Sequence, residues 1–144
     1  MFNGHYTYAI NEKGRLSIPS KFREELISSG YNYVKIANGM DPCLTAYPPD
    51  VWEEVARKVR QNASMRKAIA FFNRHVSGSL MDCEIDAQGR VLIPAGLREY
   101  AGLVKKCRIV GTIDRFEIWD VDRYEQFMQQ DKEDYRDQLA ELGL

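Results

Sequence analysis

The sequence predicts an α+β fold in which two pseudo-symmetric tandem repeats with short helices pack into one body. The first observation is a duplication, because the stretch NEKGRLSIPSKFREEL, Asn11 to Leu26, returns as DAQGRVLIPAGLREYA, Asp86 to Ala101. The second is that alternating stretches typical of half-buried strands precede both copies, and the third is that stretches of helical periodicity follow them. Two copies of a long repeat favour a closed body over an open array.

The first strand of each repeat is predicted from alternation. HYTYAI places Tyr6, Tyr8 and Ile10 on one side, and LMDCEID alternates in the same way. A polar loop follows each strand, at residues 11–14 and 86–89, with Asn or Asp first and glycine fourth. This composition is typical of a type I turn with the glycine in the left-handed conformation. We therefore expect each loop to join its two flanking strands as a hairpin.

The second strand of each repeat is short and ends at a proline. It covers residues 15–18 and 90–93, and Pro19 and Pro94 end it because proline cannot donate to a sheet ladder. A helix is expected to begin directly afterwards. Ser20 can cap this helix in the first repeat, whereas the second repeat has no equivalent side chain.

A second pair of strands and a second helix complete each repeat. YVKIANG parallels KCRIVGT, CLTAYP parallels FEIWDV, and DVWEEV parallels DRYEQF. Between the repeats, Met65, Ile69, Phe72 and Val76 fall at helical spacing and predict a connecting helix. The expected organisation is a first repeat over 1–62, a connecting helix over 63–76, a second repeat over 77–128 and an acidic C-terminal helix over 129–144.

Composition narrows the class of protein. No apolar run approaches the roughly 18 residues of a membrane span, and the N-terminal stretch lacks the apolar core of a signal peptide, so a cytoplasmic protein is expected. The three cysteines are widely scattered and only two histidines are present, which argues against a zinc site and a disulfide framework. No catalytic set, phosphate-cradling loop or metal motif is recognisable, so neither an enzyme, a cofactor nor a small-molecule substrate is predicted.

The repeated loops place an arginine directly after the glycine. Lys13, Gly14 and Arg15 of the first repeat correspond to Gln88, Gly89 and Arg90 of the second. A turn alone explains the glycine and its polar neighbours. An arginine in both copies favours anion binding, because its long side chain can lean outward from the start of a strand.

A second arginine recurs eight residues later, as Arg23 and Arg98, on the first turn of each helix. A cation at a helix N-terminus is slightly unfavourable. Its presence in both copies therefore indicates contact with an anion such as DNA, or an ion pair with a carboxylate such as Asp86 or Glu99. The sequence leaves both alternatives open.

The stretches MFNGHYTYAINEKGRLSIPSKFREEL, CEIDAQGRVLIPAGLREYAGL and VGTIDRFEIWD together resemble the MraZ family, from Met1 to about Tyr124. The resemblance implies two tandem AbrB-like domains of the double-psi or swapped-hairpin, β-barrel-like type. The family motif is D-x-K-G-R followed by an apolar-x-apolar-P run. Here Asn11 replaces the aspartate of the first motif and Gln88 replaces the lysine of the second, so the second loop is expected to bind phosphate more weakly. Nothing is carried over to the acidic C-terminal helix.

The resemblance also implies a function, namely sequence-specific binding of double-stranded DNA upstream of a division and cell-wall gene cluster, by a nucleoid-associated ring oligomer. Arg15 suits a bidentate contact with guanine, Lys13 suits a phosphate, and Arg90 suits either. Lys21 adds a nearby cation.

The formal net charge of −1 gives no overall basic signature, so one protomer is expected to bind weakly. An oligomer gains through effective concentration, by factors of roughly 10²–10⁴. It would prefer short direct repeats spaced by one helical turn, roughly 10 bp. The alternative is a ring-forming scaffold whose G-R loops bind an acidic protein partner or RNA.

The middle of the chain is basic, through Lys58, Arg60, Arg66, Lys67 and Arg74. A second DNA-binding face, a solvated helix face and a subunit contact with the acidic C-terminal helix are all compatible with this pattern.

Overall fold

The computed structural model describes every residue from 1 to 144 and confirms the α+β fold. Its strands are β1 (His5–Ala9), β2 (Arg15–Ser17), β3 (Tyr33–Asn38), β4 (Leu44–Tyr47), β5 (Met81–Glu84), β6 (Arg90–Leu92), β7 (Lys106–Gly111) and β8 (Phe116–Asp120). Its helices are α1 (Ser20–Ser28), α2 (Pro49–Gln61), α3 (Arg66–His75), α4 (Ala95–Ala101) and α5 (Val121–Glu141), with a single 3₁₀ turn η1 (Ser77–Ser79).

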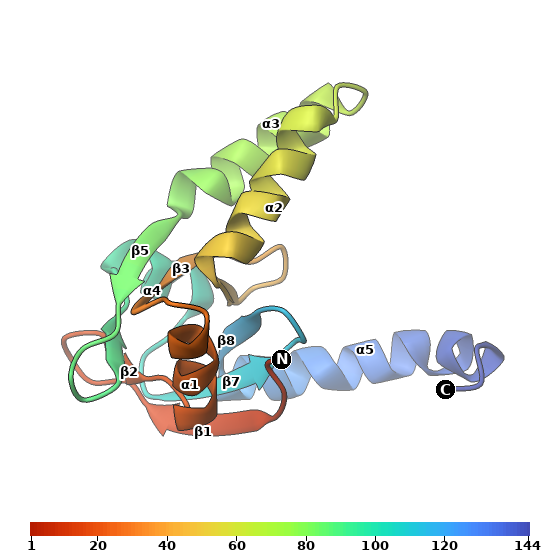
Figure 1. Cartoon of the computed structure of the whole chain (residues 1–144). Coiled ribbons are helices and arrows are strands. Elements are labelled where there is room, and N and C mark those ends of the chain that lie inside the picture. The colour runs from red at the N-terminus through yellow and green to blue at the C-terminus, as the bar shows by residue number, and fades with distance from the viewer.

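The two repeats exchange strands, as the swapped-hairpin resemblance implied. A six-stranded sheet has the order β1-β7-β8-β4-β3-β5, and a two-stranded ribbon pairs β2 with β6. Strand β1 of the first repeat therefore lies against β7 of the second, and β5 of the second lies against β3 of the first (Figure 1). Exchanging the labels of the repeats returns the same order read backwards, so a pseudo-two-fold axis relates the two halves.

The expected hairpin across each loop is wrong beyond the loop itself. The Asn11 N–H donates to the Arg15 carbonyl at 3.0 Å, and the Gly14 N–H donates to the Asn11 carbonyl at 3.0 Å, which closes a local turn. Beyond it the strands separate, because Tyr8 of β1 faces Cys107 of β7 and Arg15 of β2 faces Leu92 of β6. Pairing with the other repeat is favoured because it carries the apolar faces of both repeats into one shared core.

The shared core explains why the repeats form one body. Its main cluster comprises 20 buried residues drawn from both repeats. Leu16 of β2 and Val91 of β6 are fully buried in it, and Phe22 of α1 and Leu97 of α4 pack there as equivalents. The cap expected from Ser20 is wrong, because Ser20 is already the first helical residue and no side chain caps α1. Apolar burial by Phe22, rather than capping, holds this helix end in place.

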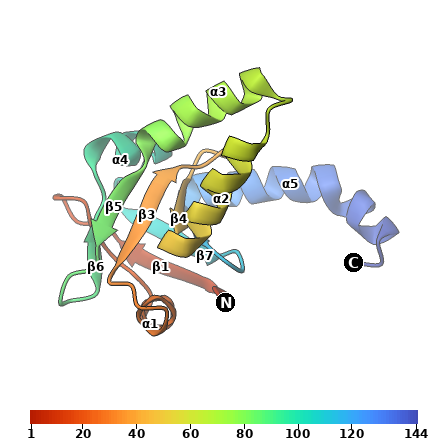
Figure 2. The ribbon, with the colours of Figure 1, turned by 45° about the horizontal axis from the view of Figure 1, so that its top comes forward.

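Two elements project from this body in different directions (Figures 1 and 2). Helices α2 and α3 form an antiparallel pair, residues 49–75, here called the arm. Trp52 of α2 and Val76, which directly follows α3, anchor it to the body. Helix α5 begins after β8, where the Asp120 carboxylate accepts the Arg123 N–H at 2.9 Å. It runs unbroken across residue 128, the expected end of the second repeat. No helix has the length and apolar character required to cross a membrane.

Candidate nucleic-acid interface

The two loops have the same internal geometry. In the first loop, residues 11–14, the Asn11 Oδ1 accepts the N–H groups of Lys13 at 3.1 Å and Arg15 at 2.8 Å. In the second loop, residues 86–89, the Asp86 Oδ1 accepts the N–H groups of Gln88 at 2.8 Å and Arg90 at 3.0 Å. Asparagine and aspartate offer the same oxygen to the backbone. The turn therefore forms equally well in both repeats despite the different charge.

Each loop glycine is buried and has a positive φ, +93° for Gly14 and +77° for Gly89. Each also lies against the helix arginine of the other repeat. A Cβ on Gly14 would lie 2.7 Å from Arg98 Nε, and a Cβ on Gly89 would lie 2.5 Å from Arg23 Cζ. Glycine is thus required both for the backbone conformation and for the room that the arginine occupies.

The two helix arginines therefore support the loops. Arg98 Nε donates to the Ile93 carbonyl at 2.9 Å, whereas Arg23 Nε is buried with no hydrogen-bond partner in the protein. The ion pair with Asp86 or Glu99 considered from the sequence is wrong, since no carboxylate lies within 4.0 Å of either guanidinium. Sequence alone could not place these side chains, because the contact forms only when the repeats interleave.

Backbone hydrogen bonds also tie each loop to the opposite repeat. The Gly14 carbonyl accepts the Ile93 N–H at 2.8 Å, and the Gly89 carbonyl accepts the Ile18 N–H at 2.9 Å. Both loops are therefore fixed to the ends of the β2–β6 ribbon, and a displacement of one repeat would displace the loop of the other.

The ribbon directs the arginines outward. Leu16 pairs with Val91 and both face the core, so the flanking residues point to the opposite face, here called the outer face. Arg15 lies opposite Leu92 on this face, and Arg90 lies opposite Ser17. Diagonal positions such as those of the two arginines are about 7–8 Å apart.

Ser17 and Leu92 occupy equivalent places in the two repeats, and neither was predicted from the sequence as a site residue. Leu92 has an exposed fraction of 50%, which is high for a leucine in a strand. Strand alternation around the buried Leu16 and Val91 was the signal that could have identified them. Because Ser17 is polar and Leu92 is apolar, the two ends of the outer face differ chemically.

The structure brings the sequence-predicted residues together. Both loops project from the same side of the body, away from the arm and α5 (Figures 1 and 2). Lys13 and Gln88 are exposed at the loops, while Arg15 and Arg90 are half-buried on the ribbon. Lys21 is exposed on the first turn of α1, the turn whose Arg23 packs on the second loop.

The charge of the two loops differs. Arg90 Nε lies 3.7 Å from the Asp86 carboxylate, whereas Arg15 forms no ion pair. The N–H groups of Arg90 and Gln88, followed by the guanidinium groups of Arg90 and Arg15, hold the pKa of Asp86 below its usual value. Asp86 is therefore charged at neutral pH and offsets part of the Arg90 charge. The first loop has the neutral Asn11 at this place, so Arg15 has no ion pair with the residue that starts its own loop.

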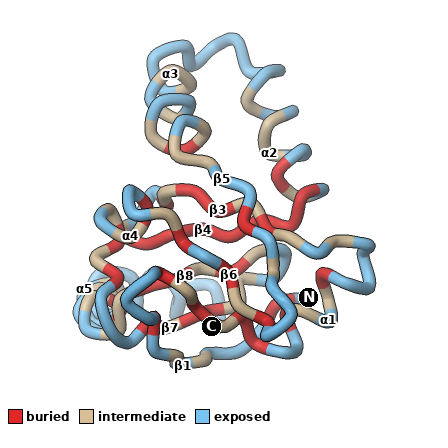
Figure 3. The backbone as a smooth tube through the Cα atoms, turned by 90° about the vertical axis from the view of Figure 1, so that its left-hand side faces the viewer, coloured by how far each residue is buried: buried red, intermediate tan, exposed pale blue.

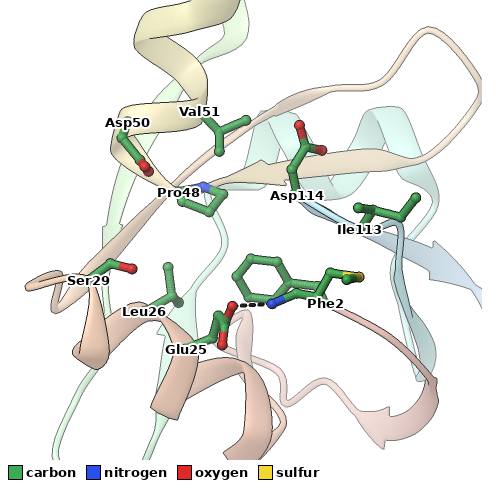
Figure 4. Close-up of a pocket in the computed structure, with 10 residues that line it drawn as sticks. Phe2, Glu25, Leu26, Ser29, Pro48, Asp50, Val51, Ile113 and Asp114 are labelled. Atoms are coloured by element: carbon green, nitrogen blue, oxygen red, sulfur yellow. Dashed lines mark hydrogen bonds and ion pairs between the residues drawn. The ribbon is translucent and has the colours of Figure 1, made fainter.

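A pocket elsewhere on the protein has the opposite electrostatic character. It has a volume of about 290 Å³ and lies between α1, the start of α2 and the turn before β8 (Figure 4). The carboxylates of Glu25, Asp50 and Asp114 line it beside Phe2 and Val51. Glu25 pairs with the Met1 ammonium group and Asp114 pairs with Arg115, and no lysine or arginine lines the pocket, so it offers a phosphate no free cation and is not part of the interface.

The cysteines are free, buried and separated. Burial raises the pKa of the Cys83 thiol to about 11 and that of Cys107 to about 12, and it also raises the pKa of Cys43. These thiols stay protonated at neutral pH, which disfavours reaction as nucleophiles. No three His, Cys, Asp or Glu side chains converge in an arrangement that could hold a metal ion.

Comparison with known proteins agrees with this architecture. The family model "MraZ protein, putative antitoxin-like" matches residues 1–74 and 80–143. Two matches of one family model reflect the internal duplication. The pair of segments covers nearly the whole chain, including the acidic helix that the sequence resemblance left out.

Individual relatives are similar over most of their length. A protein of Ligilactobacillus salivarius is 42% identical over 98% of this chain and 95% of its own, and one of Lactiplantibacillus plantarum is 43% identical over 98% and 96%. A protein of Pseudomonas aeruginosa is 41% identical over 86% of this chain and 83% of its own. All three carry the name "Transcriptional regulator MraZ".

Proposed function

The chain belongs to the MraZ family, and we propose that it is a transcriptional regulator, not an enzyme, that binds double-stranded DNA through the two loops and the outer face of the ribbon. The observation that carries this proposal is the pair of arginines on the outer face. The major groove of B-DNA is wide enough for a two-stranded ribbon, and arginine can donate two hydrogen bonds to guanine O6 and N7. A rigid ribbon with two outward arginines suits this mode of recognition.

The residues have different roles in this proposal. Arg15 and Arg90 contact base edges, while Lys13 and Lys21 contact phosphates. Arg23 and Arg98 hold the loops in place, because each packs across a glycine of the opposite repeat. Gln88 occupies the place of Lys13 without a charge, so the second loop attracts phosphate less strongly.

The site read by one protomer is expected to be directional. A perfect two-fold axis would favour a palindrome, but Lys13, Asn11 and Ser17 of the first repeat correspond to Gln88, Asp86 and Leu92 of the second. This broken symmetry favours one orientation on the DNA. We propose that several protomers in a closed ring each read one short direct repeat upstream of a division and cell-wall gene cluster, with spacing of roughly 10 bp.

RNA and an acidic protein are the alternative partners of the loops. The major groove of A-form RNA is too deep and narrow for side chains to read, so the outer face fits DNA better. If the loops instead bind an acidic protein, the chain is expected to bind DNA without discriminating between sequences at a fixed salt concentration. Sequence-specific DNA binding predicts discrimination together with a steep decrease in affinity as salt rises.

We predict that Arg15→Ala weakens DNA binding more than Arg90→Ala. Arg15 has no ion pair in the free protein, whereas Arg90 lies beside Asp86. Loss of one base contact is worth about 1–3 kcal/mol, or roughly 5- to 150-fold in affinity for Arg15. The loss for Arg90 is expected to be at least about threefold smaller, since part of its charge is already offset. Mobility-shift titrations of both variants on one DNA fragment measure the difference, and the reverse order contradicts the assignment.

Reciprocal substitutions at the first loop residue provide the matched control. Asp86→Asn keeps the oxygen that accepts the two loop N–H groups and removes the charge beside Arg90. It is expected to tighten binding by about 2- to 5-fold, which corresponds to a surface ion pair of up to about 1 kcal/mol. Asn11→Asp places the charge beside Arg15 and should weaken binding. Equal affinities for the two variants would show that this charge does not act on the interface.

A further inference from the structure

The arm and α5 are the two parts of the chain with large surfaces that nothing in the same chain covers. Helix α5 packs mainly against β7 and β8, and every residue from 132 to 144 is exposed. The distal part of the arm, residues 57–71, is exposed as well, apart from Val59, Ile69 and Ala70, which are half-buried (Figure 3). The two elements project in different directions, so α5 does not cover the arm of its own chain (Figures 1 and 2).

The exposed part of α5 carries an apolar stripe, here called the α5 stripe. Met128, Tyr135, Leu139 and Leu142 follow one another at intervals of seven, four and three residues, which places them on one helix face. Their exposed fractions are between 45% and 73%. A helix segment of this length is marginally stable in water without packing on its apolar face. The stripe therefore indicates a partner.

One flank of the α5 stripe is acidic. Residues 129–144 contain five carboxylates and two cations, a net charge of −3. At 100° per residue, Asp131 lies beside the stripe and Asp134 lies farther around on the same side, whereas Lys132 and Arg136 lie along the other edge. Neither Asp131 nor Asp134 forms an ion pair within the chain. A partner for this surface is expected to be apolar at its centre and basic at the margin that meets these two carboxylates.

The arm offers such a surface. A groove of about 360 Å³ runs between α2 and α3, here called the arm groove, with Val59, Ile69 and Phe72 among the residues that line it. Arg60 lines the same groove, and Arg66 begins α3 one turn before Ile69. Residues 57–74 contain six cations and no carboxylate, and neither Arg60 nor Arg66 has an ion pair. The arm groove thus matches the α5 stripe in both apolar character and charge.

We propose that α5 of one copy of this chain docks in the arm groove of a second copy. The α5 stripe then contacts Val59, Ile69 and Phe72, while Asp131 and Asp134 pair with Arg60 and Arg66. Each copy has one arm and one α5, so the contact joins unlike surfaces and passes from copy to copy in one direction. Contacts of this kind close into rings when the rotation between neighbours allows it.

This inference extends the oligomer of the proposed function by naming the surfaces that hold it together. It does not require DNA, because the arm and α5 project away from the loops (Figure 1). A contact that passes in one direction around a ring also presents the outer faces in the same rotational sense. Direct repeats, and not palindromes, match such an arrangement.

Charge exchange tests the contact. Variant one, Arg60→Glu/Arg66→Glu, makes the arm groove acidic, and variant two, Asp131→Arg/Asp134→Arg, makes the flank of α5 basic. Each variant opposes like charges at every contact and is expected to dissociate at concentrations at least tenfold higher than the unmodified protein does. An equimolar mixture of the two variants restores opposite charges at every contact of an alternating ring. The chain carrying all four substitutions does so as well, at the original net charge.

Sedimentation velocity without DNA measures the assembly, and circular dichroism checks that each variant is folded. Recovery of the oligomer in the mixture and in the four-substitution chain is the expected result. The proposal is overturned if variant one or variant two alone assembles at the same concentrations as the unmodified protein, or if mixing them restores no oligomer. It is also overturned if the unmodified protein stays monomeric up to roughly 100 times the concentration at which it binds DNA.

The same variants separate this proposal from the proposed function. They retain Arg15 and Arg90, so dissociated copies still bind a DNA fragment that contains one short site, although weakly. Arg15→Ala/Arg90→Ala is expected to weaken DNA binding by at least about 10-fold and to leave the sedimentation unchanged. If the charge-exchange variants or Arg15→Ala/Arg90→Ala lost both DNA binding and assembly, the two surfaces would not be independent. That result contradicts the proposed contact.

Discussion

The variant Arg15→Ala/Arg90→Ala is expected to lose at least about 10-fold in affinity for DNA while it stays folded. The contact of Arg15 with a base edge is worth about 1–3 kcal/mol, and the smaller contribution of Arg90 brings the loss to at least about 1.4 kcal/mol per protomer. Both side chains lie on the outer face, whereas the buried face of the ribbon is formed by Leu16 and Val91. Stability should therefore change little. Fluorescence anisotropy with a labelled promoter fragment at fixed salt measures the loss.

Removal of two cations elsewhere is the control for a general charge effect. Arg57→Ala/Lys58→Ala lowers the net charge by the same amount on α2, away from the loops. It is expected to change DNA affinity by less than about threefold, because charges more than one Debye length apart are largely screened. Equal losses in the two variants would mean that net charge, and not the outer face, determines binding.

The second large effect concerns stability at the loop glycines. Gly14→Ala is expected to lower the free energy of unfolding by about 2–5 kcal/mol, since alanine at φ +93° is strained by about 1–2 kcal/mol and overpacking adds about 1–3 kcal/mol. The new Cβ would lie 2.8 Å from the Ile93 carbonyl oxygen. That carbonyl belongs to a residue whose N–H is bonded to Gly14, so the two cannot separate freely. Urea denaturation at one protein concentration measures the change.

Gly30 is the matched control for the φ contribution. It has φ +87° but nothing within 4 Å of the place of its Cβ, so Gly30→Ala should lose only about 1–2 kcal/mol. The contacts at Gly89 give a further test, because the nearest atoms there all belong to the flexible Arg23 side chain. Arg23→Ala should therefore relieve part of the effect of Gly89→Ala. Arg98→Ala should restore much less of the stability that Gly14→Ala loses, because the Ile93 carbonyl oxygen remains close to the new Cβ. A Gly14→Ala variant as stable as Gly30→Ala would exclude the proposed close contact.

Sequence reasoning predicted the elements of the fold better than their partners. Alternation, turn composition and proline positions predicted β1, the loop and β2 of each repeat, because these signals depend on neighbours along the chain. Pairing of β1 with β7 and of β5 with β3 depends on which apolar faces meet in the core. Local pattern favours a hairpin equally well, so the interleaving was accessible only through the family resemblance.

The candidate site was likewise predicted only where its residues are neighbours along the chain. Lys13, Arg15 and Arg90 were identified from the loops, and the structure places both loops and the β2–β6 ribbon on one side of the body (Figures 1 and 2). The role of Arg23 and Arg98 could not be predicted, because each arginine contacts a glycine more than 60 residues away in the chain. Leu92 and Ser17 were missed because short apolar and polar residues in a strand carry no signal of binding by themselves.

The most direct test of DNA recognition by the outer face is selection of bound sequences from a random DNA pool by the purified protein. The unmodified chain is predicted to enrich a short motif that recurs in one orientation with a spacing of roughly 10 bp. The Arg15→Ala/Arg90→Ala variant, carried through the same selection, is predicted to enrich nothing. Enrichment of a single palindrome, or of the same direct repeats by the double variant, would contradict recognition by the two loops and the ribbon.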